Sequence, residues 1–186
     1  MDATAARALG ALHVAPFSER RWRHTVSVVR RARDLSLGLS DEDRALIEAA
    51  AWLHDLGYAP AVAAVGFHPL DGARFLRTQG WRQDICDLVA HHSCADVEAD
   101  RRGAGEALRE EFADRPGPVR DVLWGADATI GPAGERLSVD ERVREVLSRY
   151  GAGSLVAECM VAIAPQLAAA LARVEVRLVH EAAQPT

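Results

Sequence analysis

The chain has 186 residues, of which 49% are hydrophobic and 26% charged, and its formal net charge is -5 at pH 7. All 22 basic residues are arginine, because the sequence contains no lysine. This length and composition predict one soluble globular domain. The acidic balance argues against binding to nucleic acid, which requires a basic face to neutralise phosphates.

The sequence gives no sign of targeting to a membrane. No window approaches the roughly 18 apolar residues that a membrane-spanning helix needs. The N-terminal run MDATAARALG lacks the basic and then apolar order of a secretion signal. We therefore expect a cytoplasmic protein without a membrane partner. The three cysteines are widely spaced, which favours free thiols over disulfide bonds or a zinc knuckle.

Apolar residues recur at helical spacing through most of the chain, and no alternating run predicts a strand. Ser40 is a suitable N-cap, and the three acidic residues that follow it suit the first turn of a helix. Pro69 suits the first position of another helix, after a loop over 59–67. The helices expected in this part of the chain cover 18–37, 41–55, a segment from 69, 82–92, 105–113 and 118–130.

The C-terminal third is also predicted to be helical. Residues 138–141 have the sequence of a capping box, which opens the next helix. The sequence over 154–180 is again helical, and Pro165 is expected to kink or split that helix. We therefore predict an all-α fold, a single-domain helical bundle over residues 1–181, followed by a disordered tail over 182–186.

Side chains able to bind metal lie on the apolar faces of three predicted helices. His24 shares a face with the apolar residues of the first, His54 continues the apolar stripe of the second and precedes Asp55, and Asp127 stands among apolar residues further on. Each alone has an ordinary explanation, such as a satisfied core histidine or an aspartate paired with arginine. One divalent cation, however, would satisfy both histidines and both aspartates together.

Three more histidines lie between these positions. His68 opens the third helix, and His91 and His92 close the next one. Neighbouring residues on a helix point about 100° apart, so both His91 and His92 reach one centre only if it lies at the helix end. Which of the two is a ligand is left open. With these extra imidazoles, the sequence predicts two metal ions side by side.

This order of residues, a histidine, a His-Asp pair, three histidines and a late aspartate, resembles the HD-domain superfamily of metal-dependent phosphohydrolases. The match runs from about Arg20 to Asp127. The resemblance implies that Asp55 bridges the two metals and that Asp55 and His54 are catalytic. It also implies that His24, His54 and Asp127 hold one metal and that His68, His91 and His92 supply the ligands of the other.

The ligand types restrict the chemistry. Nitrogen and oxygen donors without thiolate suit two divalent ions, and the number of imidazoles favours Mn, Fe, Co or Zn over Mg. Two such ions about 3.5–4 Å apart lower the pKa of a water molecule and neutralise charge on phosphoryl oxygens. We therefore expect hydrolysis of a phosphoester or phosphoanhydride bond in a small phosphorylated metabolite, with a nucleotide as the expected substrate.

Two phosphohydrolase subfamilies share parts of this pattern. The run HPLDGA over 68–73 resembles cyclic-di-GMP phosphodiesterases, but no GYP segment follows, and Arg20 occupies the place of the glutamate in members with three metals. In size and ligand order the chain resembles the bacterial diadenosine tetraphosphate hydrolases more closely. Those proteins carry a lysine soon after the His-Asp pair, where this chain has Tyr58. We therefore expect the substrate phosphate to be bound by arginine, first Arg20 and second Arg102.

Two other functional classes stay open. Some HD-fold proteins with a similar ligand set are oxygenases with a mixed-valence diiron centre. Oxygenases of this kind that are related to phosphonate cleavage carry a basic and aromatic run after the histidine of the fourth helix. In this chain the corresponding run, CADVEADRRG, follows His92 and Ser93 and does not resemble it. The other alternative is a non-catalytic module in which bound metal or nucleotide serves stability or sensing. The oligomeric state is open as well.

Overall fold

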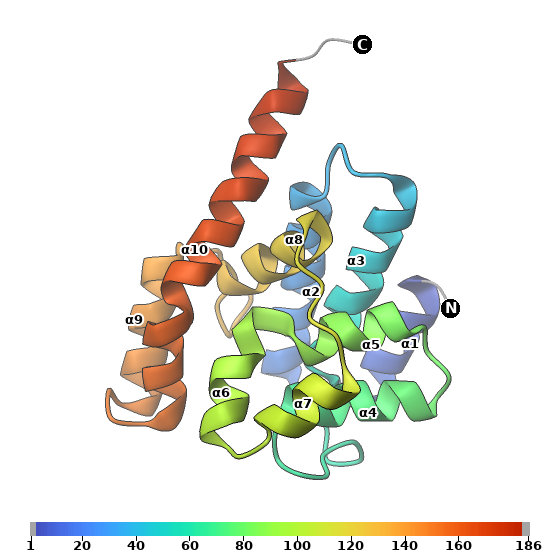
Figure 1. Ribbon diagram of the computed structural model, residues 1–186, viewed down its shortest axis with the longest axis vertical. Helices are drawn as coiled ribbons and strands as arrows, with labels where there is room; N and C mark the ends of the chain where they lie inside the picture. Colours follow the sequence, from blue (N-terminus) through green and yellow to red (C-terminus); the bar gives the residue numbers. More distant parts are fainter. Residues whose placement is uncertain (1–2, 184–186) are drawn as a thin grey trace.

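The computed structural model describes residues 3–183, which form helices joined by turns and short loops, with no strand in that range (Figure 1). The all-α prediction is confirmed. The elements are α1 (Ala3–His13), α2 (Glu19–Leu35), α3 (Asp41–Leu53), η1 (Leu56–Tyr58), α4 (His68–Thr78), α5 (Gln83–Ala90), η2 (His92–Cys94), α6 (Ala95–Arg101), α7 (Gly105–Glu111), α8 (Pro118–Ala128), α9 (Val139–Tyr150) and α10 (Leu155–Ala182).

Serine caps begin several of these helices. Ser18 Oγ accepts a hydrogen bond from the backbone N–H of Arg21 at the start of α2, and Ser40 Oγ accepts one from Asp43 at the start of α3. Ser138 forms the complete capping box with Glu141 at the start of α9. The predicted N-cap and capping box are therefore confirmed, and they fix where the chain enters the helices that surround the site.

Two helices were not anticipated from the sequence. Helix α1 packs on α3 and has a short, alanine-rich buried face, which gives a weak periodic signal. Helix α6 directly follows η2, where Ser93 and Cys94 have φ of 51° and 56°. Two consecutive non-glycine residues in the left-handed region turn the chain sharply, and side-chain periodicity does not reveal such a turn.

Helix α10 runs unbroken through Pro165, so the predicted split is not found. Pro165 lies on the exposed face of the helix. Proline has no backbone N–H, and the carbonyl one turn earlier, which therefore lacks a helical donor, can bond to water there. The helix extends to Ala182 and is capped at Ala183, so the first residues of the predicted tail are ordered. Residues 184–186 lie outside the described part of the chain.

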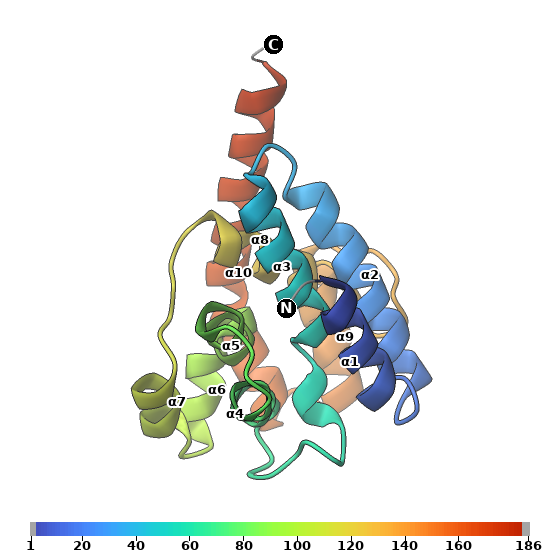
Figure 2. The same ribbon diagram turned by 90° about the vertical axis from the view of Figure 1, so that its right-hand side faces the viewer.

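The length and hydropathy of α10 correct one expectation. An 18-residue window of this helix has a mean hydropathy of 1.8, so α10 is long and apolar enough to cross a membrane by those two criteria. Of that window, 28% is buried, where α10 packs on α8 and α9. The helix projects beyond the rest of the fold in both views (Figures 1 and 2). One such helix is weak evidence for a membrane span, because core helices of soluble proteins meet the same criteria.

The core brings the ends of several helices to one place. Helix α2 packs on α3 and α8, and α4 packs on α5 and η1. Fully buried residues such as Val28, Leu53 and Leu123 fill the space between them. Helix α10 is joined to α8 by Arg173, whose guanidinium donates two hydrogen bonds of 2.7 Å to the buried carboxylate of Asp121. The pair α9 and α10 therefore forms a wall beside the ends of α2, α3 and α8.

Candidate metal centre

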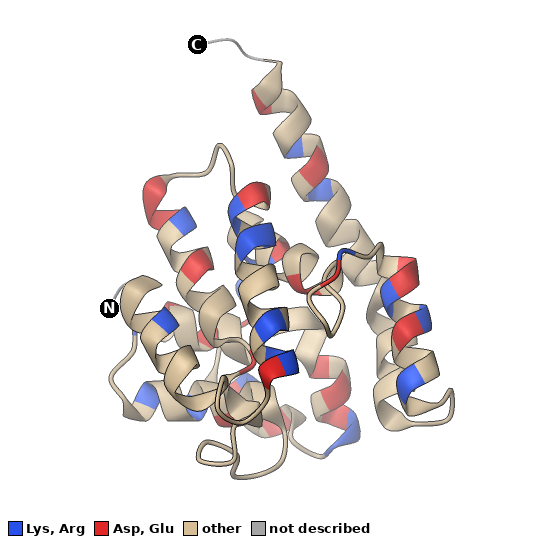
Figure 3. Ribbon diagram, turned by 180° about the vertical axis from the view of Figure 1, so that it is seen from behind, with Lys and Arg blue, Asp and Glu red and all other residues tan. Residues whose placement is uncertain are grey.

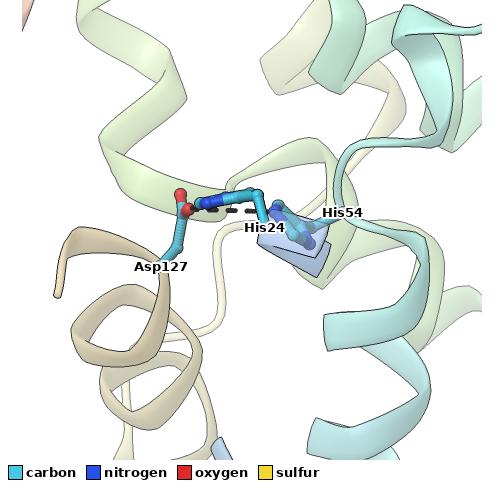
Figure 4. Close-up of side chains that lie close together, drawn as sticks. All are labelled: His24, His54 and Asp127. Carbon is cyan, nitrogen blue, oxygen red and sulfur yellow. Dashed lines mark hydrogen bonds and ion pairs between the residues drawn. The ribbon is translucent and has the colours of Figure 1, made fainter. Parts of the chain in front are cut away.

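A first group of possible ligands combines His24 of α2, His54 at the end of α3 and Asp127 of α8 (Figure 4). One donor atom of each lies within 4.8 Å of those of the other two. His24 Nε2 is 2.9 Å from Asp127 Oδ1, and His54 Nε2 is 3.8 Å from the same oxygen. His54 Nε2 is buried and has no hydrogen-bond partner among the described residues. An unpartnered imidazole nitrogen facing a carboxylate fits a metal ligand.

A second group of possible ligands consists of Asp55, His68 and His92, whose donor atoms also lie within 4.8 Å of one another. His68 Nε2 is 3.1 Å from His92 Nε2 and 3.8 Å from Asp55 Oδ1. Two imidazole nitrogens this close must share a proton or a cation, because two lone pairs repel each other. The donor set again fits a divalent ion of the transition series.

The Asp55 carboxylate lies between the two groups. Its Oδ1 is the oxygen that faces His68, whereas its Oδ2 is 3.6 Å from His54 Nε2 and 3.9 Å from His24 Nε2. One oxygen therefore faces each group. This is the arrangement expected of a carboxylate that bridges two cations.

Backbone carbonyls orient three of the imidazole rings. In each of His24, His54 and His92, Nδ1 lies at hydrogen-bonding distance from a carbonyl oxygen, which leaves Nε2 directed into the site. Donation from Nδ1 fixes the neutral tautomer with a free Nε2, as is typical of metal-binding histidines. The carbonyls, in the same order, belong to Gly131 at 3.0 Å, Ala51 at 2.8 Å and Val89 at 2.6 Å.

The structure does not bring His91 into this cluster. Its Nε2 is 3.0 Å from the carbonyl oxygen of Phe112, and its Nδ1 is 3.1 Å from Asp96 Oδ1. Both nitrogens thus face partners outside the two groups, whereas the ring of His92 faces His54 and His68. Of the neighbouring pair, the structure brings His92 to the other candidate ligands, whereas His91 lies outside both groups.

Ser93 is a site residue that the sequence did not single out. Its hydroxyl donates to Asp127 Oδ2, the oxygen not directed at His24. The left-handed backbone at Ser93 follows immediately after His92, so both side chains can face the same space. Backbone strain of this kind is often found at functional sites.

Arg21 is a second residue that the sequence did not single out. Its Nη1 donates to Asp55 Oδ2 at 2.8 Å, and its guanidinium carbon lies 3.5 Å from the ring centre of Tyr58. Tyr58 in turn stacks on His68, with ring centres 3.8 Å apart. Arg21 lies three residues before His24 on α2, a spacing that places both on one face of the helix. This stack holds a fixed positive charge beside the second group of ligands.

The two arginines predicted to bind phosphate have different positions. Arg20 lines the cavity above the site, and its side chain is 57% exposed. Arg102 does not line that cavity; it pairs with Glu98 four residues earlier, at 2.7 Å, near the end of α6. The structure therefore brings Arg20 to the cavity but not Arg102, whose guanidinium is held by Glu98 instead.

The carboxyl groups of the site are held ionised. Burial opposes ionisation of Asp55, but its electrostatic interactions with the surrounding imidazoles and with the Arg21 guanidinium outweigh burial and place its pKa well below the usual range. Burial likewise opposes ionisation of Asp127, but its hydrogen bond with His24 and the nearby histidines lower its pKa well below the ordinary value. Burial lowers the pKa of both His68 and His92, which keeps these imidazoles neutral and able to ligate.

We expect the affinity for Mn²⁺ to fall as the pH is lowered, beginning above the ordinary range of a histidine. Burial opposes protonation of His24, but its hydrogen bond and charge interaction with Asp127 outweigh burial and raise its pKa. A proton bound to Nε2 must leave before a metal can bind, so metal and proton compete. Titration calorimetry in buffers of different ionisation enthalpy should show proton release. An affinity that is constant across the histidine range would contradict this role for His24.

A cavity of about 330 Å³ opens directly onto these groups. Its floor includes His24, Asp55, His68, His92 and Asp127. Its opposite wall is formed by side chains of α9 and α10, among them Arg142 and Met160. The cavity therefore gives a small molecule access to both ligand groups at once.

The comparisons with known proteins agree with this geometry. A family model described as HD domain matches residues 21–138, a stretch that contains every predicted metal ligand. Searches among curated proteins and among solved structures gave no match. HD domains are in general metal-dependent hydrolases, and the two clusters of His and Asp residues are suited to binding metal. The resemblance seen in the sequence is thus confirmed, and the chain belongs to the HD domain family.

Proposed function

We propose that the protein is a dinuclear metal-dependent phosphohydrolase that cleaves a phosphoester or phosphoanhydride bond of a small phosphorylated metabolite, with nucleotides as the first class to test. The observation that carries the proposal is the position of Asp55, which directs one carboxylate oxygen toward each of two groups of possible ligands. A mononuclear site would need only the first group. The second group, which places the neutral imidazoles of His68 and His92 with their Nε2 atoms 3.1 Å apart beside the buried Asp55, is otherwise a costly arrangement.

The residues fit a pair of divalent ions. His24, His54 and Asp127 would hold one ion, His68 and His92 the other, and Asp55 would contact both. We expect Mn, Fe, Co or Zn rather than Mg, because imidazoles dominate the donor set. When bound, such ions supply an activated water at neutral pH and offset the negative charge that develops on phosphoryl oxygens.

Residues of the chain have separate tasks around that pair. Arg21 places a fixed positive charge beside Asp55 and lines the cavity, so it is suited to orient a phosphate oxygen of the substrate. It thereby supplies the cation that lysine provides in the related hydrolases mentioned above. Tyr58 holds Arg21 by stacking, and burial raises the pKa of Tyr58, so its phenol stays neutral. Ser93 holds Asp127 in place through its hydroxyl hydrogen bond.

The test is a hydrolysis screen with the full chain supplied with Mn²⁺, Co²⁺ or Fe²⁺. We expect release of phosphate or a nucleotide from at least one compound in a panel of nucleotides, dinucleoside polyphosphates and sugar phosphates. Elemental analysis of the same sample should give close to two metal ions per chain. A panel without any hydrolysis would overturn the proposed reaction, and saturation at one metal ion per chain would overturn the dinuclear centre.

A further inference from the structure

Three arginines gather around one glutamate of α9, beside the cavity that the candidate metal ligands line. Arg149 Nε lies 3.0 Å from Glu145 Oε1, and Arg142 pairs with the other oxygen of the same carboxylate. Arg20, which comes from α2, lies 3.9 Å from Glu145 Oε1. No other carboxylate is within ion-pair distance of these three guanidinium groups in residues 3–183. Three positive charges thus share one negative charge, and the cluster carries a net positive charge of two.

The arginine cluster (Arg20, Arg142 and Arg149) faces the same cavity as the candidate metal centre. The side chains of Arg142 and Arg149 are only 14% and 26% exposed, so neither is freely solvated. Burial and the charges of Arg142 and Arg20 lower the pKa of Arg149, as expected where positive charge is in excess. Basic and acidic residues are interspersed along α9 (Figure 3). The excess of positive charge at the cavity therefore arises because the fold turns Arg142 and Arg149 toward it.

The cavity between the cluster and the ligands also has an apolar part. Val156, Met160 and Ile163 of α10 line it. Helices α9 and α10 follow the end of the family match at residue 138, so these residues belong to this chain's own C-terminal wall. An apolar wall beside a charged cluster suits an organic segment that carries an anion at its end.

We propose that the arginine cluster is a second anion subsite and that the substrate carries two phosphate-like anions joined by an organic segment. One anion would lie at the metal ligands and be hydrolysed, and the other would be bound by Arg142, Arg149 and Arg20. This inference rests on the proposed hydrolase function only for the substrate anion that is hydrolysed; binding of the other anion does not depend on it. It excludes monophosphate esters of neutral alcohols as the preferred substrates, because these would leave the excess positive charge of the cluster uncompensated.

The test uses alkane bisphosphonates of increasing chain length and the matching alkyl monophosphonates, none of which can be hydrolysed. Calorimetry with the metal-loaded full chain should show that, at one or more chain lengths, the bisphosphonate binds at least about tenfold more tightly than its monophosphonate, the gain expected from one charge-assisted contact. The variants Arg142→Gln and Arg149→Gln should each remove most of that advantage and leave monophosphonate binding unchanged.

Arg144→Gln is the matched control, because Arg144 lies on the same helix but lines a different groove, and among residues 3–183 its hydrogen-bond partner is the carbonyl of Asp140. It should keep the full advantage. The subsite is overturned if no chain length favours the bisphosphonate, or if Arg144→Gln reduces the advantage as much as Arg142→Gln does. Selective binding of bisphosphonates without hydrolysis of any phosphoester would support the subsite and contradict only the proposed hydrolase function.

Discussion

Replacing Asp55 with alanine should remove both metal ions from the purified protein and abolish hydrolysis. The Asp55 carboxylate faces both groups of candidate ligands, so each ion of the proposed dinuclear centre would lose a charged donor when the carboxylate is deleted. We expect activity to fall by at least about 10³-fold, the range seen when one group that stabilises developing charge is lost. Elemental analysis should fall from close to two ions per chain to well below one.

Asp127→Ala provides a graded comparison. Asp127 belongs only to the first group, so its loss should weaken one ion and leave the set of His68, His92 and Asp55 intact. Asp41→Ala and His180→Ala are suitable controls, because both residues are exposed and distant from the ligand groups in the structure. Circular dichroism should confirm that each variant stays folded. Retention of both metal ions in folded Asp55→Ala would contradict the bridging role.

The ligand set shows how far helical periodicity alone can predict a site. His24, His54 and Asp127 each fall on an apolar stripe, and the structure places all three together. Helical periodicity could not decide between His91 and His92, because α5 ends at Ala90 and both residues lie after the regular helix. The two rings differ in their partners: His92 Nδ1 lies 2.6 Å from the Val89 carbonyl oxygen, whereas the nitrogens of His91 face Phe112 and Asp96. Partners of this kind leave no periodic signature in the sequence.

The arginines proposed to bind phosphate show a second limit of sequence-based prediction. Arg20 and Arg21 lie four and three residues before His24, and both spacings place a side chain on the same face. Only the tertiary fold separates them, because Tyr58 and Asp55, from beyond the end of α3, hold Arg21 against the second ligand group. Arg20 instead points toward α9 and Glu145. Spacing along one helix therefore predicts candidates, whereas partners distant in sequence select among them.

The C-terminal helices were predicted as elements but not as part of the site. Helix α10 packs on α8, and together with α9 it lines the cavity beside the candidate ligands. The repeat of apolar residues in α10 does not indicate either contact. The hydrogen-bonded ion pair between Arg173 and the buried carboxylate of Asp121 supports that docking, and it joins residues 52 positions apart. In the proposed function the substrate contacts a wall whose place comes from long-range packing, which is why the sequence alone left the substrate open.

The close approach of η1 and α4 leads to the second large expected effect. Gly57 follows the His-Asp pair by two residues, and a Cβ added there would lie 2.0 Å from the carbonyl oxygen of His68 and 2.7 Å from the backbone nitrogen of Gly72. Both are backbone atoms, so no side chain can move aside to relieve the clash. Gly57→Ala should therefore push α4 away from η1 and destabilise the fold by on the order of 3 kcal/mol.

The same displacement moves His68, because His68 is the first residue of α4 and its carbonyl is the atom that clashes. We expect Gly57→Ala to lower the melting temperature by roughly 10 °C and to bind one metal ion per chain instead of two. Gly153→Ala is the control, because no described atom outside its immediate neighbours lies within 4 Å of a Cβ placed there. If Gly57→Ala kept both ions and the normal melting temperature, the contact between η1 and α4 could not be what positions His68, and the second half of the metal centre would need another support.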